Sequence, residues 1–183
     1  MNRRVNPRFF FHGTLGAGKS HLLAALACLL RREGKLVVYV PDCSELLADP
    51  TEYFRTALEL AYDRNVPLRS HLKSLRREEV DALVALERLK YFCRLVATPS
   101  DPALFIVDQA NALDDETILG SQQFSNDKKK QVRTLLDAST ASHLKLESST
   151  ANYKHAWGNS RRQTSKKRIG LCCGLDEVFA EHR

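Results

Sequence analysis

The sequence lacks any apolar run long enough to cross a bilayer, which takes about 20 consecutive apolar residues in a helix. Its first residues are polar and basic, so the apolar core of a secretory signal peptide is missing as well. These two absences argue against a membrane protein and against export through a cleaved leader. We therefore expect an intracellular protein with no membrane partner.

Cysteines are few, and their spacing suits neither a zinc site nor a disulfide framework. They are Cys28, Cys43, Cys93, Cys172 and Cys173, and no two of them form a C-x-x-C pair. Short zinc-binding motifs use that spacing, and an odd number leaves one thiol outside any full set of disulfides. We expect free or buried thiols in a reducing compartment.

Charge is moderate and unevenly distributed. The 183 residues include 43% apolar and 27% charged side chains, which is ordinary for a globular protein. Residues 1–150 hold 21 basic and 19 acidic side chains, whereas residues 151–183 hold 7 basic and 3 acidic ones. We expect one domain over residues 1–156 and a basic C-terminal extension over residues 157–183, which would suit a nucleic acid or another polyanion.

The strongest motif is a glycine-rich loop near the N-terminus. It reads Gly13-Thr14-Leu15-Gly16-Ala17-Gly18-Lys19-Ser20, which has the form G-x-x-x-x-G-K-[ST] of a phosphate-binding loop, or P-loop. Glycine allows backbone dihedrals that side chains forbid, so successive N–H groups can point toward one anion. Lys19 would supply a positive charge to the β- and γ-phosphates, and Ser20 would supply a hydroxyl ligand to Mg²⁺.

The flanking sequence supports this interpretation. Residues 8–12 form an apolar, strand-like run directly before the loop, and leucines recur at helical spacing after it until Gly34. A P-loop lies between a strand and a helix in this way, and the helix adds the positive end of its dipole. The residues expected to bind the nucleotide are Gly13, Thr14, Leu15, Gly16, Ala17, Gly18, Lys19, Ser20 and His21.

The rest of the chain alternates between strand-like and helix-like segments. Apolar runs that indicate buried strands occupy residues 35–40, 103–107 and 143–148. Helical patterns occupy residues 50–62, 68–96 (kinked or in two pieces) and 124–138, and Pro67 interrupts the chain before the second of these. The alternation predicts an α/β fold of the P-loop NTPase type, with a mainly parallel sheet of about four to five strands between helices.

A second part of the site is expected at the end of the third strand. The run Leu104-Phe105-Ile106-Val107-Asp108 has the shape of a Walker B segment, whose terminal carboxylate holds Mg²⁺ through its water shell. The next residue is Gln109, and a neutral amide orients water but cannot accept its proton. We therefore expect slow or partner-dependent hydrolysis, with the acidic residues 114–116 as an alternative source of a base.

Polar residues end the fourth strand. The segment Ser148-Ser149-Thr150-Ala151-Asn152 follows an apolar run, and a polar side chain at such a strand tip can reach the γ-phosphate or the attacking water. Asn152 is the best candidate for this role, although asparagine also forms turns. The expected catalytic residues are Lys19, Asp108, Gln109 and Asn152, and the expected ligands of Mg²⁺ are Ser20 and Asp108.

Four phrases of the sequence carry a family resemblance. They are FFFHGTLGAGKSHLLAALACLL, VVYVPDCSELLADPTEYFRTAL, LFIVDQANALDDE and SSTAN. They resemble the P-loop NTPase module of Crinkler-type effectors, which is similar to that of retrotransposon-hot-spot proteins and lies near the AAA+ and STAND ATPases. The resemblance covers residues 5–155, and its Asp108-Gln109-Ala110-Asn111 phrase is more particular than the P-loop.

The resemblance carries expectations about the nucleotide, the strand order, the site residues and the place of action. It implies ATP as the nucleotide, and a sheet whose third strand lies between the P-loop strand and the fourth strand. It implies that Lys19 and Ser20 contact phosphate and Mg²⁺, that Asp108 is the Walker B acid and that Asn152 is sensor-like. An effector-like role would imply delivery into a host cell or action in the nucleus.

Two other functions stay open at this point. A small-molecule or nucleotide kinase would fit the length of the chain, but it needs a mobile lid that carries an arginine. An interaction module that is stabilised by nucleotide without turning it over would fit Gln109. Such a module would have a protein partner or a second copy of the chain as its target.

Three basic groups carry weaker signals. The lysine run 128–130 lies on a predicted helix and is expected to form a solvated face. The clusters at residues 161–162 and 166–168 suit a nuclear-import signal, a contact to a nucleic-acid backbone or a solvated tail. Arg133 and the two arginines at 161–162 are candidate arginine fingers, and the sequence does not choose among them.

Overall fold

The computed structural model describes residues 8–13, 16–77, 82–97, 102–113 and 124–149. The strands are β1 (Arg8–His12), β2 (Val37–Val40), β3 (Leu104–Val107) and β4 (Leu144–Ser149). The helices are α1 (Lys19–Arg32), α2 (Cys43–Ala48), α3 (Pro50–Ala61), α4 (Val66–Arg77), α5 (Ala82–Leu95), the 3-10 turn η1 (Ala110–Leu113) and α6 (Asn126–Ser139). Within the described ranges, each helix is too short or too polar to span a bilayer.

The strands form one fully parallel sheet in the order β1-β4-β3-β2. Val40 pairs with Val107, Val107 with Glu147, and Phe11 with Ser148. The predicted α/β class and parallel sheet are therefore confirmed. The strand order implied by the family resemblance is wrong, because β4, and not β3, lies beside the strand that leads into the P-loop.

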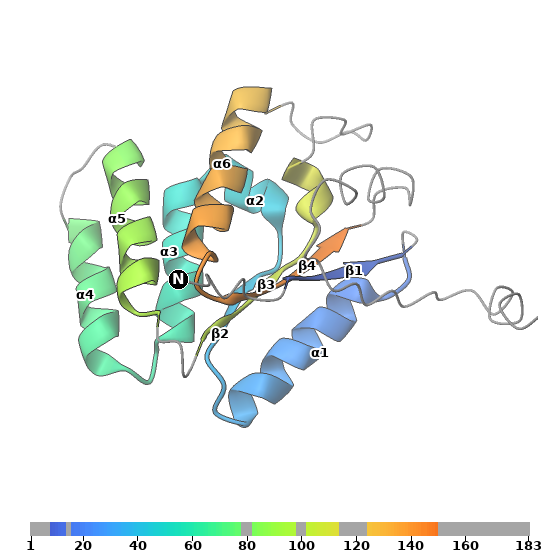
Figure 1. Cartoon of the computed structure of the whole chain (residues 1–183), viewed down its shortest axis with the longest axis horizontal. Helices are drawn as coiled ribbons and strands as arrows, with labels where there is room; N and C mark the ends of the chain where they lie inside the picture. The colour runs from blue at the N-terminus through green and yellow to red at the C-terminus, as the bar shows by residue number, and fades with distance from the viewer. Residues whose placement is uncertain (1–7, 14–15, 78–81, 98–101, 114–123, 150–183) are drawn as a thin grey trace, which may run out of the picture.

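The strand order sets the direction of each crossover connection and thereby the face on which its helices lie. The chain passes from β2 to β3 and from β3 to β4 between neighbouring strands, so each step moves the same way along the sheet. The connection from β1 to β2 moves the opposite way, past both other strands. Because parallel crossovers are right-handed, α1 lies on one face of the sheet, and α2, α3, α5 and α6 lie on the other (Figure 1).

Alternate side chains of the strands face two separate apolar layers, because successive side chains of a strand point to opposite faces. The strand residues facing the larger core of α2 to α6 are Val38, Val40, Phe105 and Val107. Those facing α1 include Phe11, Val37 and Ile106, which pack with Leu23 and Ala27 of that helix. The sheet is thus buried on both faces, as its nearly continuous apolar strands indicate.

Apolar periodicity does not predict helix α2, but the sequence contains a capping signal for it. The Asp42 carboxylate accepts hydrogen bonds from the backbone N–H groups of Ser44 at 2.7 Å and Glu45 at 3.4 Å. An aspartate followed three residues later by glutamate is typical of a helix start. The Asp42–Glu45 spacing therefore indicates α2 from sequence.

Pro67 begins a helix instead of interrupting the chain, which corrects the predicted start at Leu68. It is the second residue of α4, where a missing N–H costs nothing because first-turn N–H groups have no partner within the helix. The side-chain oxygen of Asn65 caps this end by accepting the N–H of Leu68 at 3.2 Å. The long helical stretch is two helices, α4 and α5, on either side of residues 78–81.

The three cysteines within the described ranges are free thiols, in line with the sequence prediction. Cys28 is exposed on α1, whereas Cys43 and Cys93 are buried. Burial is the main cause that raises the pKa of the Cys93 thiol to about 12. Cys93 is therefore protonated and behaves as a small apolar core residue.

His143 lies just before β4 and connects α5 with the segment that leads into β3. Its Nδ1 accepts the backbone N–H of Ala103 at 3.2 Å, and its Nε2–H donates to the carbonyl oxygen of Cys93 at 2.9 Å. The ring is 2% exposed and lies 5.2 Å from the ring of Phe105. Burial lowers the pKa of His143, because the charged imidazolium would be removed from water.

This arrangement predicts acid sensitivity. Because the native pKa lies below the unfolded value of about 6.5, the unfolded chain takes up the proton first as the pH falls. The free energy of unfolding should therefore fall below pH 6.5, by up to about 1.4 kcal/mol per pH unit for this one proton. Urea titrations between pH 4.5 and 8 should show the slope in the wild type and in His71→Gln, an exposed control, and a reduced slope in His143→Gln. An equal slope in all three proteins would contradict this assignment.

Candidate functional site

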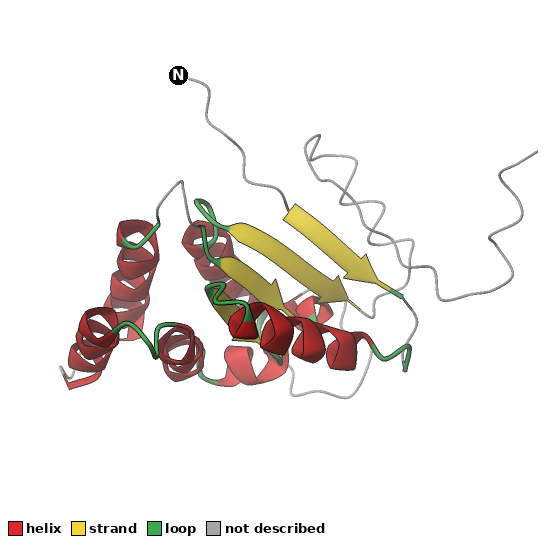
Figure 2. Ribbon diagram, turned by 90° about the horizontal axis from the view of Figure 1, so that it is seen from below, coloured by secondary structure: helices red, strands yellow, loops and turns green. Residues whose placement is uncertain are grey.

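Polar groups from all four strands collect at one edge of the sheet. The strands are parallel, so their carboxyl ends meet there, as the arrowheads in Figure 2 show. Gly13 follows β1, Asp42 follows β2, Asp108 follows β3, and Ser148 lies near the end of β4. In open α/β sheets this edge is where ligands bind.

Two glycines of the glycine-rich loop have backbone angles that other residues rarely adopt. Gly16 and Gly18 have φ angles of 80° and 74°, in the left-handed region that favours glycine. Gly18 is the N-cap of α1, and no side chain of the described residues caps this helix end. The first-turn N–H groups of α1 are therefore available to an anion, and the helix dipole favours a negative charge there.

Lys19 lies within the loop and not in solvent. Its side chain is 6% exposed, and its Nζ donates to the carbonyl oxygen of Gly13 at 2.9 Å. The ammonium therefore reaches across the loop from the first turn of α1 to the end of β1. Ser20 and His21 follow it on α1 and are exposed. Thr14 and Leu15, the other predicted loop contacts, lie outside the described residues.

Asp108 is a buried carboxylate whose two oxygens have different surroundings. It is 1% exposed, and its Oδ1 accepts from the backbone N–H of Gln109 at 2.8 Å and from the hydroxyl of Ser148. Its Oδ2 is buried and has no hydrogen-bond partner among the described residues. Burial, and then the charge of Asp108, raise the pKa of Tyr39 on the neighbouring strand. A buried oxygen without a donor favours a cation, because such an oxygen is otherwise costly.

Ser148 is the site residue that the sequence analysis did not single out. Val107 pairs with Glu147, so the next residues along the two strands, Asp108 and Ser148, are neighbours. Ser148 also pairs with Phe11, two residues before the loop begins. The hydroxyl thus lies between the P-loop strand and Asp108, and the register of the parallel sheet is the signal that places it there.

Gln109 occupies a strained position directly after Asp108. It has a φ angle of 54°, the one positive φ among the described residues other than glycine. Its carbonyl oxygen accepts the N–H of Ala112 at 3.0 Å, which closes the turn into η1. A side chain in this region costs roughly 1–2 kcal/mol, and such strain is found often at functional sites.

Asn152, the acidic residues 114–116 and the basic extension 157–183 lie outside the described residues. The sensor-like role of Asn152 and the alternative base therefore remain predictions. The same holds for the nuclear-import and nucleic-acid interpretations of the extension.

The lysine run 128–130 is not one solvated face, which corrects that prediction. Successive helical residues point about 100° apart, so three in a row cannot share a face. Lys129 is 7% exposed. Lys128 donates to the carbonyl oxygen of Ala48 at 3.3 Å and lies 5.0 Å from the ring centroid of Phe124. Lys130 is the exposed member of the run.

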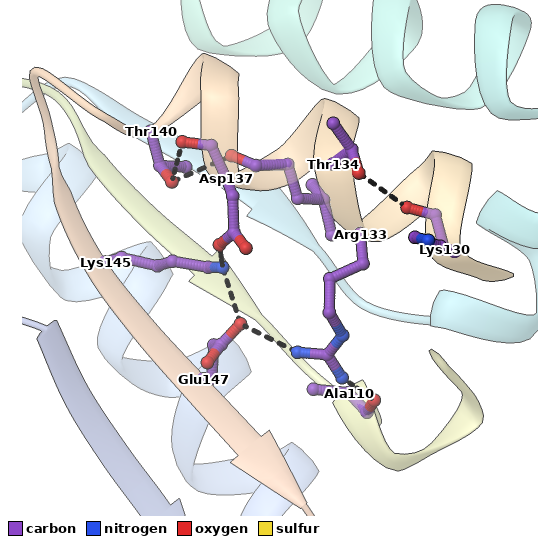
Figure 3. Close-up of polar contacts among 9 residues, drawn as sticks. Ala110, Lys130, Arg133, Thr134, Asp137, Thr140, Lys145 and Glu147 are labelled. Carbon is purple, nitrogen blue, oxygen red and sulfur yellow. Dashed lines mark hydrogen bonds and ion pairs between the residues drawn. The ribbon is translucent and has the colours of Figure 1, made fainter. Parts of the chain in front are cut away.

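Arg133 is partly exposed, but contacts within the protein occupy its guanidinium, which argues against its use as an arginine finger. Its Nη2 donates to the carbonyl oxygen of Ala110 at 3.3 Å, and its Nη1 lies 3.9 Å from Oε1 of Glu147 (Figure 3). An arginine finger needs a guanidinium that is free to reach a phosphate. In this structure the guanidinium of Arg133 contacts the turn that follows Asp108.

A separate hollow lies between α5 and α6. Its volume is about 710 Å³, and its lining includes Leu86 and Lys90 of α5 and Gln131 and Leu135 of α6. None of the residues that line it belongs to the predicted nucleotide site. The hollow is therefore an alternative location that a ligand-binding experiment must distinguish from the edge of the sheet.

No protein-family model matches the sequence, and no curated protein matches it significantly. The resemblance to the Crinkler-type module therefore rests on the motifs alone. It remains an expectation about function.

We expect the hydrogen bond between Ser148 and Asp108 to contribute measurably to the free energy of unfolding. Ser148→Ala leaves a buried carboxylate with one donor fewer, so the free energy of unfolding should fall by roughly 1–3 kcal/mol. Ser70→Ala on α4 removes an exposed hydroxyl and should change stability by about 0.5 kcal/mol or less. Chemical denaturation of the two variants checks this. Equal stability of Ser148→Ala and the wild type would show that Asp108 does not depend on the hydroxyl.

Proposed function

We propose that this chain is a P-loop NTPase domain that binds a nucleoside triphosphate with Mg²⁺ at the carboxyl edge of its sheet. One observation carries the proposal. The glycine-rich loop with Lys19 and the buried Asp108 come from distant parts of the sequence, and Ser148 lies between them on the strand that separates β1 from β3. Phosphate binding and metal binding need these two groups at one site.

The loop would bind the phosphates through its backbone. Left-handed glycines and the uncapped start of α1 supply N–H groups and a positive dipole end for oxygen anions. Lys19 would exchange its bond to the carbonyl oxygen of Gly13 for a phosphate oxygen. That exchange is favourable, since hydrogen bonds between charged groups are stronger than those to a neutral carbonyl.

The donor groups fit Mg²⁺ well. This ion prefers oxygen ligands, keeps several waters and is held by one or two protein groups together with phosphates. Oδ2 of Asp108 lacks a hydrogen-bond partner within the described residues, and the hydroxyl of Ser20 is exposed at the start of α1. Asp108 and Ser20 would hold the ion, which would neutralise charge on the phosphates.

Slow or partner-dependent hydrolysis of ATP follows from the group beside Asp108. Gln109 cannot accept a proton from water, so it would orient the nucleophile without acting as a base. The choice of ATP over other nucleotides rests on the family resemblance. Gln109 also favours a second candidate, a nucleotide-stabilised interaction module that does not turn over.

Nucleotide binding provides the direct test. The dissociation constant for Mg-ATP, measured by calorimetry, should rise about 100-fold or more in Lys19→Ala, which corresponds to roughly 2.7 kcal/mol. Lys35→Ala removes the same charge from an exposed position after α1 and should leave the constant unchanged. A wild-type protein that binds neither ATP nor GTP would refute the proposal.

Phosphate release, followed in the same samples, separates the two candidates. Release that Lys19→Ala abolishes identifies a hydrolase. Tight binding without release identifies the interaction module or a domain that needs a partner to complete its site. Transfer to an added acceptor instead of water would identify a kinase.

A further inference from the structure

A network of charges, buried at its β4 residues and partly exposed at its α6 residues, lies on the face of β4 that α6 covers (Figure 3). Lys145 and Glu147 are both almost fully buried, with side chains 2% and 4% exposed, and their charged groups are 2.6 Å apart. The same ammonium contacts Oδ1 of Asp137 on α6 at 3.0 Å. Arg133 of α6 completes the group, with Nη1 3.9 Å from Oε1 of Glu147. The four side chains carry two positive and two negative charges.

This network reaches the turn that follows Asp108. The second terminal nitrogen of Arg133 donates to the carbonyl oxygen of Ala110 at 3.3 Å, and Ala110 begins η1. One guanidinium therefore contacts the buried carboxylate of β4 and the backbone of η1 with two different nitrogens. A planar fork with fixed donors suits such a double contact, whereas an ammonium is a single charged point.

Two consecutive residues of β4 thus act on the same short segment from opposite faces of the sheet. On the α1 face, Ser148 donates to the carboxylate of Asp108. On the α6 face, Glu147 contacts Arg133, which holds the carbonyl of Ala110. The strained Gln109 lies between these two anchors. Strain of this kind persists only where surrounding contacts hold the backbone in place.

We propose that Arg133 is a positioning residue of the nucleotide site: paired with Glu147, it fixes the Asp108–Ala110 turn and so sets the position of the carboxylate that would hold Mg²⁺. The positioning role follows from the contacts of the nucleotide-free protein, while its effect on Mg²⁺ rests on the proposed function. In this role Arg133 would act without contacting nucleotide or metal. Its effect passes through the backbone of Ala110.

The variants separate the charge of Arg133 from its geometry. Arg133→Met removes both contacts. Arg133→Lys keeps a positive charge near Glu147 but cannot span the carboxylate and the Ala110 carbonyl in the same way. The double variant Arg133→Met with Glu147→Gln restores charge balance in case the excess negative charge around Lys145 destabilises the fold. Lys130→Met is the matched control, since it removes an exposed positive charge from the same helix.

Amide hydrogen exchange in the absence of nucleotide measures the positioning directly. The N–H groups of Gln109 and Ala112, which bond within the turn, should exchange about 10-fold faster in all three Arg133 variants than in the wild type. The N–H of Leu104, which bonds to the carbonyl oxygen of Leu36, should exchange at the wild-type rate. Lys130→Met should change none of these rates.

The second readout is nucleotide affinity with and without the metal. The dissociation constant for Mg-ATP should rise about 10-fold in Arg133→Met and Arg133→Lys, with that for ATP in EDTA unchanged, because the P-loop is intact. A variant that merely loosened the fold would weaken both. Unchanged exchange at Gln109 and Ala112 would overturn the inference, as would equal weakening with and without Mg²⁺.

The two proposals fail in different ways. A wild-type protein that binds no nucleotide, yet shows faster exchange in the Arg133 variants, would reject the proposed function and keep Arg133 as the residue that holds the turn. A wild-type protein that binds Mg-ATP, with exchange unchanged in the variants, would keep the function and reject the role of Arg133.

Discussion

The proposed site depends on one buried carboxylate, whose second oxygen has no hydrogen-bond partner within the described part of the chain. Asp108 is held on one oxygen by Gln109 and Ser148, while its second oxygen has no donor among the described residues. A protein that needed Asp108 for folding alone would gain from a further donor, because an unpaired buried oxygen is unfavourable. Under the proposed function, a cation bound beside the glycine-rich loop would complete the pairing of this oxygen.

The order of the strands brings these groups together. Because β4 lies between β1 and β3, a single strand contacts the end of the P-loop strand and the end of the Asp108 strand. Its consecutive residues Glu147 and Ser148 then face opposite layers, one toward α6 and one toward the loop. The same alternation that buries both faces of the sheet lets β4 hold the Asp108 turn from two sides. A movement of the Asp108–Ala110 turn would therefore change its contact with Arg133 of α6.

Patterns formed by neighbouring residues predict much of this fold. Features that depend on how distant segments pair are not visible in those patterns. Apolar runs such as residues 104–107 and helical leucine spacing after Lys19 depend on neighbours in sequence, so the strands and most helices were predicted correctly. The positive φ angles of Gly16 and Gly18 are also a local property, because glycine adopts them readily. The strand order instead depends on which distant segments pair with one another. The role of Ser148 depends on the register between β4 and its neighbours. A single sequence displays neither. The alternating charges of β4 do not reveal that α6 covers and pairs them.

A crystal structure of the protein with Mg²⁺ and a non-hydrolysable ATP analogue tests the central claim most directly. The account predicts that the triphosphate lies against the backbone of residues 13–20, with Lys19 turned from Gly13 to phosphate. The metal is expected beside Oδ2 of Asp108. A nucleotide bound in the hollow between α5 and α6, or a glycine-rich loop left empty at saturating nucleotide, would contradict the account.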